Sequence, residues 1–240
     1  MTDPALLDHR RWLGYAQPVG LVVSPPALLD AQAYVNRNIA AEHRAFVAEV
    51  RELPLPDGLT APVITDWPRL LVEQFGWQPD DLQAAPPSLW FALPEYNDVL
   101  RASHAVRALN PAPGASEWLA LMQVCKPGTA LDEPEASAGW PASPQARFER
   151  LLRETQQPIG LLSNGLELRL VYAPRGESSG TLAFPIAAML DTDGRILFAA
   201  LSMLLSAERW FTLPEAQRLP AILAASRQYQ NTVSTQLAAQ

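Results

Sequence analysis

Apolar residues recur at helical spacing over the first third of the chain. Ser24 followed by two prolines is a signal for the start of a helix, and the apolar pattern continues for nearly thirty residues. We therefore expect one long helix from about Pro26 to Glu52. The proline-rich segment 53–64 predicts a linker. Asp66 and Gly76 are residues that cap and end helices, so they predict a second helix between them.

Beyond residue 87 the pattern changes to short apolar runs separated by turn residues. Runs at 88–96, 99–109 and 118–125 predict strands. Asn164-Gly165, which lies between two apolar runs, predicts a β-hairpin. The run 181–190 predicts a further strand, and Pro185 restricts that strand to a sheet edge or to the start of a helix.

Helical patterns return between and after these strands. Ser143 and Pro144 predict the start of a helix, and 194–211 is apolar on most of its helical faces. That second helix should be buried or lie against a partner. Residues 215–240 predict further helix, with a break near Pro220.

This order of elements predicts an α+β fold with a mixed central sheet. We expect an N-terminal helical segment over 1–85, packed on a sheet core over 86–192, and a C-terminal helical connector over 193–240. The three parts should form one compact unit.

Composition and charge narrow the function classes. The 240 residues are 48% hydrophobic, which is ample for a packed core, and the formal net charge is −7. An acidic chain does not coat itself with nucleic acid, so any DNA contact must be local or shared with other domains. The apolar runs are too short to cross a bilayer and no basic, apolar leader opens the sequence. We expect a cytoplasmic protein without a membrane partner.

The cysteine and histidine content does not indicate a metal site. Cys125 is the single cysteine, so it cannot form an internal disulfide, and the three histidines are scattered without zinc-site spacing. Free cysteine usually behaves as a small packed apolar residue. We interpret Cys125 as a strand residue rather than a nucleophile.

Several segments carry a resemblance to a known family. "LPEYNDVLRASHAV", "QVCKPGTALD" and the stretch from Arg147 to Phe184 are similar to the N-terminal region of Eco57I-like bacterial DNA methyltransferases. Such enzymes occur in type IIG restriction-modification and in phage-defence systems such as DISARM. The resemblance runs from about Gly14 to Phe211.

The resemblance implies a nuclease-type domain of the PD-(D/E)XK class, ahead of a helical connector and a methyltransferase domain that binds S-adenosylmethionine. That class places an acid at the end of one strand and an acid-x-lysine on the next. The two carboxylates hold a divalent cation, and the lysine helps to orient the attacking water. No methyltransferase motif occurs in this chain, so S-adenosylmethionine is expected in a domain beyond Gln240, and no cofactor is expected within the chain.

This sequence departs from the nuclease pattern at each position. If 118–125 is the second strand, Gln123 takes the acid position and Cys125 the lysine position, while Lys126 is displaced to the other face. On the preceding strand, Ser103 and His104 stand where Pro-Asp is expected. The resemblance therefore implies a degenerate, catalytically inactive site that holds no metal.

Two other functions stay open from the sequence. Glu95, Asp98 and Asp132 are nearby acids that could substitute for the missing carboxylates in an active metal-dependent endonuclease. A protein-interaction module is the other alternative, favoured by the acidic charge and by the apolar helix from Ile196 to Phe211.

Candidate DNA contacts come from arginine, which supplies nearly all the positive charge. Arg147, Arg150 and Arg153 recur every third residue on one expected helix, where they could meet phosphates or form a solvated face. Arg175 lies in a glycine-flanked polar loop that could contact phosphate or be an ordinary connection. We expect a DNA-binding or assembly domain whose partners are DNA and the other domains or subunits of a defence complex.

Overall fold

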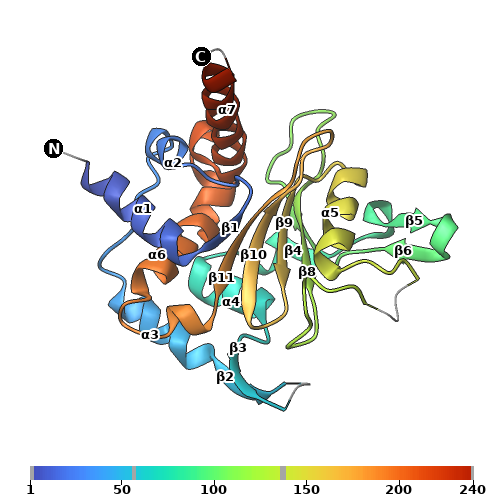
Figure 1. Ribbon diagram of the computed structural model, residues 1–240, viewed down its shortest axis with the longest axis horizontal. Coiled ribbons are helices and arrows are strands. Elements are labelled where there is room, and N and C mark those ends of the chain that lie inside the picture. The colour runs from blue at the N-terminus through green and yellow to red at the C-terminus, as the bar shows by residue number, and fades with distance from the viewer. Residues whose placement is uncertain (1–2, 56–57, 136–138, 239–240) are drawn as a thin grey trace.

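The computed structural model describes residues 3–55, 58–135 and 139–238, with the backbone alone from residue 230 onward. It has an α+β fold. A large mixed sheet lies between a thick layer of helices and a thinner layer made by one helix and a separate hairpin (Figure 1). The strand order in the sheet is β1-β11-β10-β9-β8-β7-β4.

The large sheet draws its strands from most of the chain. They are β1 (Gln17–Val19), β4 (Leu82–Ala84), β7 (His104–Arg107), β8 (Trp118–Val124), β9 (Ile159–Ser163), β10 (Glu167–Tyr172) and β11 (Gly180–Pro185). The β8–β9 pair is parallel and the other neighbouring pairs are antiparallel. Parallel neighbours need a crossover, which a helix between them provides.

Two small hairpins stand outside this sheet. They are β2 (Arg51–Pro54) with β3 (Thr60–Val63), and β5 (Phe91–Leu93) with β6 (Asp98–Leu100). The run expected as a strand at 88–96 contains β5, which belongs to the separate hairpin. The run at 99–109 is divided between the end of β6 in that hairpin and β7, which begins at His104 in the large sheet. The expected linker at 53–64 overlaps β2 and contains β3, while residues 56–57 lie outside the described part of the chain.

The helices are α1 (Pro4–Tyr15), α2 (Pro25–Asp30), α3 (Ala40–Glu49), α4 (Trp67–Phe75), α5 (Pro144–Glu154), α6 (Arg195–Leu205) and α7 (Leu219–Ala238). Short 3₁₀ turns are η1 (Pro79–Asp81), η2 (Pro87–Leu89), η3 (Pro94–Tyr96), η4 (Ala187–Met189) and η6 (Glu215–Gln217), and η5 (Glu208–Thr212) is a π-helical turn. Helix α7 begins one residue before Pro220, which occupies its first turn.

The local signals for caps and turns are confirmed. The Asp66 carboxylate accepts from the Arg69 amide at 3.0 Å, and Gly76 ends α4 with a φ of 78°. The Ser143 hydroxyl accepts from the Ala146 amide at the start of α5. At the hairpin between β9 and β10, the Asn164 side chain accepts from the backbone while Gly165 has a φ of 81°.

The expected long helix at 26–52 is wrong. Helix α2 ends after one and a half turns, because Gln32 has a φ of 51° and the Ala33 amide donates back to the Leu28 carbonyl at 2.8 Å. The Asn36 side chain then accepts from the Asn38 amide in a local turn. Apolar residues of this loop are nevertheless buried, and their spacing in the sequence matches the apolar spacing of a helix.

Two further boundaries differ from expectation. Strand β11 is not an edge strand, because β1 pairs with its outer side, and Pro185 stands at the end of the strand where no further amide is needed. The apolar helix expected to run to Phe211 ends at Leu205, and the π-helical turn η5 follows.

The core is divided by the sheet. Helices α1, α3, α4 and α6 belong to the larger apolar cluster, whereas α5 covers the opposite face with a smaller one. Eight residues of α6 are buried, so the apolar character of this helix is used within the fold. None of the described helices is long and apolar enough to cross a membrane.

Candidate functional site

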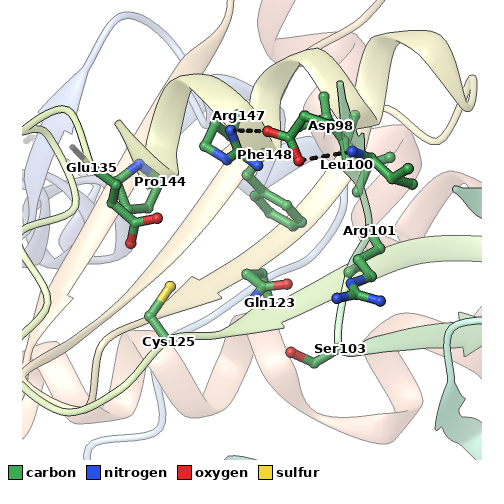
Figure 2. Close-up of a pocket in the computed structure, with 13 residues that line it drawn as sticks. Asp98, Leu100, Arg101, Ser103, Gln123, Cys125, Glu135, Pro144, Arg147 and Phe148 are labelled. Carbon is green, nitrogen blue, oxygen red and sulfur yellow. Dashed lines mark hydrogen bonds and ion pairs between the residues drawn. The ribbon is translucent and has the colours of Figure 1, made fainter. Parts of the chain in front are cut away.

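A pocket opens on the α5 face of the sheet, where strands β6 and β8 end. Its volume is about 380 Å³. The polar side chains that line it are those of Asp98, Arg101, Ser103, Gln123, Cys125, Glu135 and Arg147, and Phe148 supplies an aromatic wall (Figure 2). Three separate stretches of chain and one helix thus meet at one hollow.

Strand alternation explains why the tip of β8 carries polar residues. Leu121 faces the α5 side and is fully buried, while Ala120 and Met122 pack into the larger cluster on the other side. Gln123 and Cys125 continue the Leu121 side beyond the cover of α5, so they line the pocket instead of the core. On this side of the strand the residues therefore change from core packing at Leu121 to lining the pocket at Cys125.

The end of β7 is tied to β8 at the pocket. Ser103 accepts a hydrogen bond from the Val124 amide at 3.1 Å, which holds its hydroxyl beside Gln123. His104 belongs to the other face, where burial lowers its pKa. Lys126 is exposed beyond the strand and does not line the pocket. Of the five positions predicted as a degenerate site, Ser103, Gln123 and Cys125 come together.

Asp98 is the one substitute acid that reaches the pocket. Its carboxylate forms an ion pair of 2.7 Å with Arg147 and accepts from the Trp140 amide at 3.1 Å and the Val99 amide at 2.7 Å. The Arg147 hydrogen bond is the main cause that lowers the Asp98 pKa to about 2. This carboxylate is charged but fully engaged.

The other two substitute acids lie elsewhere. Glu95 sits in the turn of the β5–β6 hairpin and pairs with Arg150 at 3.2 Å. Asp132 meets Arg169 through two hydrogen bonds of 2.7 Å, and this partner lowers its pKa. The structure does not bring Glu95, Asp98 and Asp132 together.

Cys125 is chemically quiet in this setting. The pKa of its thiol is raised to about 11, mainly by burial and also by the nearby Glu135 carboxylate, while a hydrogen bond with the Gln123 side chain acts in the opposite direction. A protonated thiol is a poor nucleophile. The environment of Cys125 therefore does not favour covalent chemistry at neutral pH.

The predicted arginine row is already paired along α5. Arg147 holds Asp98 and also donates to the Trp140 carbonyl at 2.8 Å, Arg150 holds Glu95, and Arg153 lies 3.5 Å from Glu149. The four carboxylate and carbonyl contacts order these side chains. Phosphate contact by this row stays a prediction, as it does for Arg175 in its exposed turn.

Sequence reasoning missed Arg101, Glu135 and Phe148 as pocket residues. Phe148 could have been placed by the apolar stripe of α5, which it shares with Leu151 and Leu152. Arg101 and Glu135 lie in loops whose path no local signal predicts. Arg147 was named as a candidate phosphate contact on a helix face that could also be solvated, and in the structure it forms an ion pair with Asp98.

The pocket does not fit the divalent cation of a nuclease. Within the described residues, no group of three or more histidine, cysteine or acidic side chains could hold a metal ion. The two pocket acids are Asp98, which Arg147 already neutralises, and the exposed Glu135 at the rim. Neutral Gln123 and Ser103 cannot replace carboxylate ligands.

Comparisons with family models, curated proteins and solved structures find no match to this chain. The chemistry of the pocket is therefore the evidence for function. Its side chains can donate and accept hydrogen bonds and contact an anion through Arg101, and they offer an aromatic wall. They provide neither an ionised nucleophile nor a free pair of carboxylates.

Proposed function

We propose that this chain is a nuclease-like, catalytically inactive domain that binds DNA or takes part in the assembly of a larger complex. The observation that carries the proposal is the pocket at the ends of β7 and β8. It gathers Ser103, Gln123 and Cys125, positions at which the resemblance to PD-(D/E)XK nucleases places the reactive groups. Here those groups are neutral.

The strand topology around the pocket also supports the proposal of a nuclease-like domain. Strand β7 runs antiparallel to β8, and helix α5 then leads to β9, which lies parallel to β8. This places the two strand ends and α5 around one hollow, which is a layout suited to contact with a phosphodiester backbone. The missing carboxylates remove the cation that hydrolysis would need.

The wider context proposed for the chain comes from the resemblance alone. It is that of the N-terminal part of a DNA methyltransferase of restriction-modification or phage defence, acting in the cytoplasm with other domains or subunits. S-adenosylmethionine would bind to a domain beyond Gln240. Sequencing the native reading frame past that codon tests the context, and a frame without methyltransferase motifs would contradict it.

The catalytic half of the proposal is tested by incubating the chain with supercoiled and linear DNA and either Mg²⁺ or Mn²⁺. We expect no cleavage, because no free carboxylate pair lines the pocket. Cleavage that is lost in Asp98→Asn, but kept in the distant surface variant Asp8→Asn, would show a migrated active site and refute the proposal.

The binding half is tested by titrating a short duplex at several salt concentrations. Each neutralised phosphate adds about 0.9 to the slope of log affinity against log salt, so a three-arginine patch gives at most about 3. We expect Arg153→Ala to weaken binding and lower the slope by about 1. Arg37→Ala, on an arginine that pairs with Asp8 far from α5, is the matched control. Equal binding by both variants would place the contact outside this row.

A further inference from the structure

The β5–β6 hairpin leaves large aromatic side chains open to solvent beside the pocket. Trp90 is 42% exposed and Tyr96 is 39% exposed, whereas Trp12, Trp67 and Trp77 are at most 1% exposed. The hairpin projects from the α5 side of the sheet (Figure 1). Burying an aromatic ring is favourable, so these two partly open rings on one projection are candidates for contact with a partner.

An arginine accompanies each of these aromatic groups. The guanidinium carbon of Arg101 lies 5.8 Å from the centre of the Trp90 ring, and that of Arg150 lies 4.9 Å from the centre of the Trp140 ring. The Tyr96 and Trp140 rings are 5.9 Å apart with a tilt of 31°. We call these five residues, Trp90, Tyr96, Arg101, Trp140 and Arg150, the stacking surface.

Strand pairing explains how the surface arises. Phe91 pairs with Leu100 and Ala92 with Val99, so alternate residues face α5 or solvent. Leu93 and Leu100 are buried toward α5, while Ala92 and Val99 are exposed on the outer face.

By the same alternation Trp90 and Arg101 belong to this outer face. Trp140 and Arg150 lie instead on the side of the hairpin that faces α5, where Arg150 is also 5.8 Å from the centre of the Phe91 ring and Trp140 packs against the smaller apolar cluster.

The arginines of the surface are available to an anion. Within the described residues no carboxylate lies within ion-pair distance of Arg101, which also lines the pocket. Arg150 pairs with Glu95, but the Glu95 side chain is 51% exposed, and such surface pairs contribute little. Phosphate can compete for both guanidinium groups.

Rings that stack on bases, alternating with cations that contact the backbone, are the chemistry of single-stranded nucleic acid sites. A protein partner would instead favour aromatic anchors at the centre of a patch depleted of charge. A DNA duplex does not offer its base faces, because they are stacked inside the helix. The mixture of open rings and arginines therefore favours an unpaired strand.

We propose that the stacking surface binds a short single-stranded segment of nucleic acid. Its bases stack on Trp90 and on the Tyr96–Trp140 pair, and Arg101 and Arg150 contact its phosphates. Beyond Arg101 the strand reaches the pocket, where the Ser103 hydroxyl and the Gln123 amide can bond to the edge of one base. This inference rests on the proposed association with DNA and adds the unpaired strand as the form that is recognised.

The test uses the full chain and an oligothymidylate of twelve nucleotides, which forms no secondary structure. Stacking should quench tryptophan emission, and because Trp118 is also partly open, the part of the quenching that is lost in Trp90→Ala is the part that reports on the stacking surface. We expect Trp90→Ala to weaken binding roughly 10- to 100-fold and to remove part of the quenching, and Trp90→Phe to retain most of the affinity. Arg101→Ala should lower the salt slope by about 0.7.

Tyr34→Ala is the matched control, because Tyr34 is 57% exposed but lies away from the hairpin, in the loop after α2. Unchanged oligothymidylate binding by Trp90→Ala, or no binding by the parent at low salt, would overturn the inference. Binding of the duplex without the oligonucleotide would overturn it while leaving the proposed function intact. Binding of the oligonucleotide without the duplex would support it and refute duplex recognition.

Discussion

The two faces of the central sheet are built for different purposes. On the face covered by α1, α3, α4 and α6, large rings pack together, with Phe198 lying within 6.4 Å of the rings of His43, Phe46 and Phe75. On the α5 face the apolar cluster is smaller and stops at the pocket. The face covered by α1, α3, α4 and α6 carries the larger apolar core, and the α5 face carries the polar side chains of the pocket.

Strand β8 serves both faces at once. Ala120 and Met122 are fully buried on the helical side, while Leu121, Gln123 and Cys125 point to the α5 side. Alternation along a strand allows a polar residue to replace an apolar one on one face without disturbing the other. A site can therefore lose its reactive groups while the sheet keeps its stability.

The comparison predicts that the helical face contributes most to stability. Phe198→Ala should lower the free energy of unfolding by about 3–5 kcal/mol, because it empties the centre of a ring cluster. Phe148→Ala, an equally buried ring at the pocket wall, should cost about 1–2 kcal/mol less, since water from the pocket can fill the space. Urea unfolding of both variants measures the difference. Equal losses of unfolding free energy would show that the two faces of the sheet contribute equally to stability.

The α5 face is nevertheless closely packed away from the pocket. A Cβ at Gly160 would overlap the Phe148 ring, so Gly160→Ala should cost about 1–3 kcal/mol in thermal or urea unfolding. Gly14→Ala is the matched control, because nothing lies within 4 Å of its Cβ and α1 gains a better helix former. That variant should be about 0.5–1 kcal/mol more stable than the parent. If Gly160→Ala is neutral or stabilising, α5 does not pack closely against β9 at this position.

The Asp98–Arg147 pair should stabilise the α5 face in a pH-dependent way. Because the folded pKa of Asp98 is about 2, below its ordinary value, the contribution is complete above about pH 4 and is lost as pH falls toward 2. Asp98→Asn should cost about 1 kcal/mol at pH 7, the scale of partly open ion pairs. The difference between parent and variant should shrink as pH falls through 2 and vanish only below it.

Titration of the Asp98 carboxyl by NMR checks the cause of this effect directly. In Arg147→Gln the Asp98 pKa should rise toward 3.8, because the main interaction that lowers it is gone. A pKa that stays near 2 would assign the shift to the Trp140 and Val99 amides instead.

The smallest expected effect on stability is at the tip of β8. Cys125→Ser should change the free energy of unfolding by no more than about 0.5 kcal/mol, since Cys125 is only partly buried. Its thiol should alkylate about 100-fold more slowly near pH 8 than in the urea-unfolded chain, because its pKa is about 11 rather than 9.0. Glu135→Gln should speed alkylation. An alkylation rate in the folded chain equal to that of the unfolded chain would show that solvent reaches the Cys125 thiol freely.

Local signals were enough for much of the fold. The caps at Asp66 and Ser143 and the turn at Asn164-Gly165 each depend on residues within a few positions, so the sequence carries the whole cause. The α+β class followed from the order of apolar patterns. The continuous helix at 26–52 failed because burial of loop residues after Gln32 depends on tertiary contacts that periodicity cannot distinguish from a helix.

Contacts between residues far apart in the sequence are the part of the sheet and of the site that could not be predicted. Strands β1 and β4 have three residues each, too few for an alternating pattern, and each is fixed by a partner outside its local segment, which for β1 is β11 near the other end of the chain. Ser103, Gln123 and Cys125 were named as site positions from the resemblance to PD-(D/E)XK nucleases, and strand alternation explains why Gln123 and Cys125 face the same side. Asp98 became part of the pocket only through Arg147, and Arg101 through the path of the chain after β6, neither of which a local pattern encodes.

The pairing of β1 with β11 has a consequence for how the protein is made. The Ser24 amide donates to the Ser226 hydroxyl across 202 positions of sequence, and the Trp12 ring stacks on Phe184 of β11. At about 5–20 residues per second, a ribosome needs roughly 10–40 s to produce the partner of Ser24. Until β11 and α6 have been synthesised, α1 can pack only on neighbouring elements such as α2 and lacks most of its native apolar cover. The nascent N-terminal segment thus exposes apolar surface that the finished fold buries, for as long as its C-terminal partners are missing.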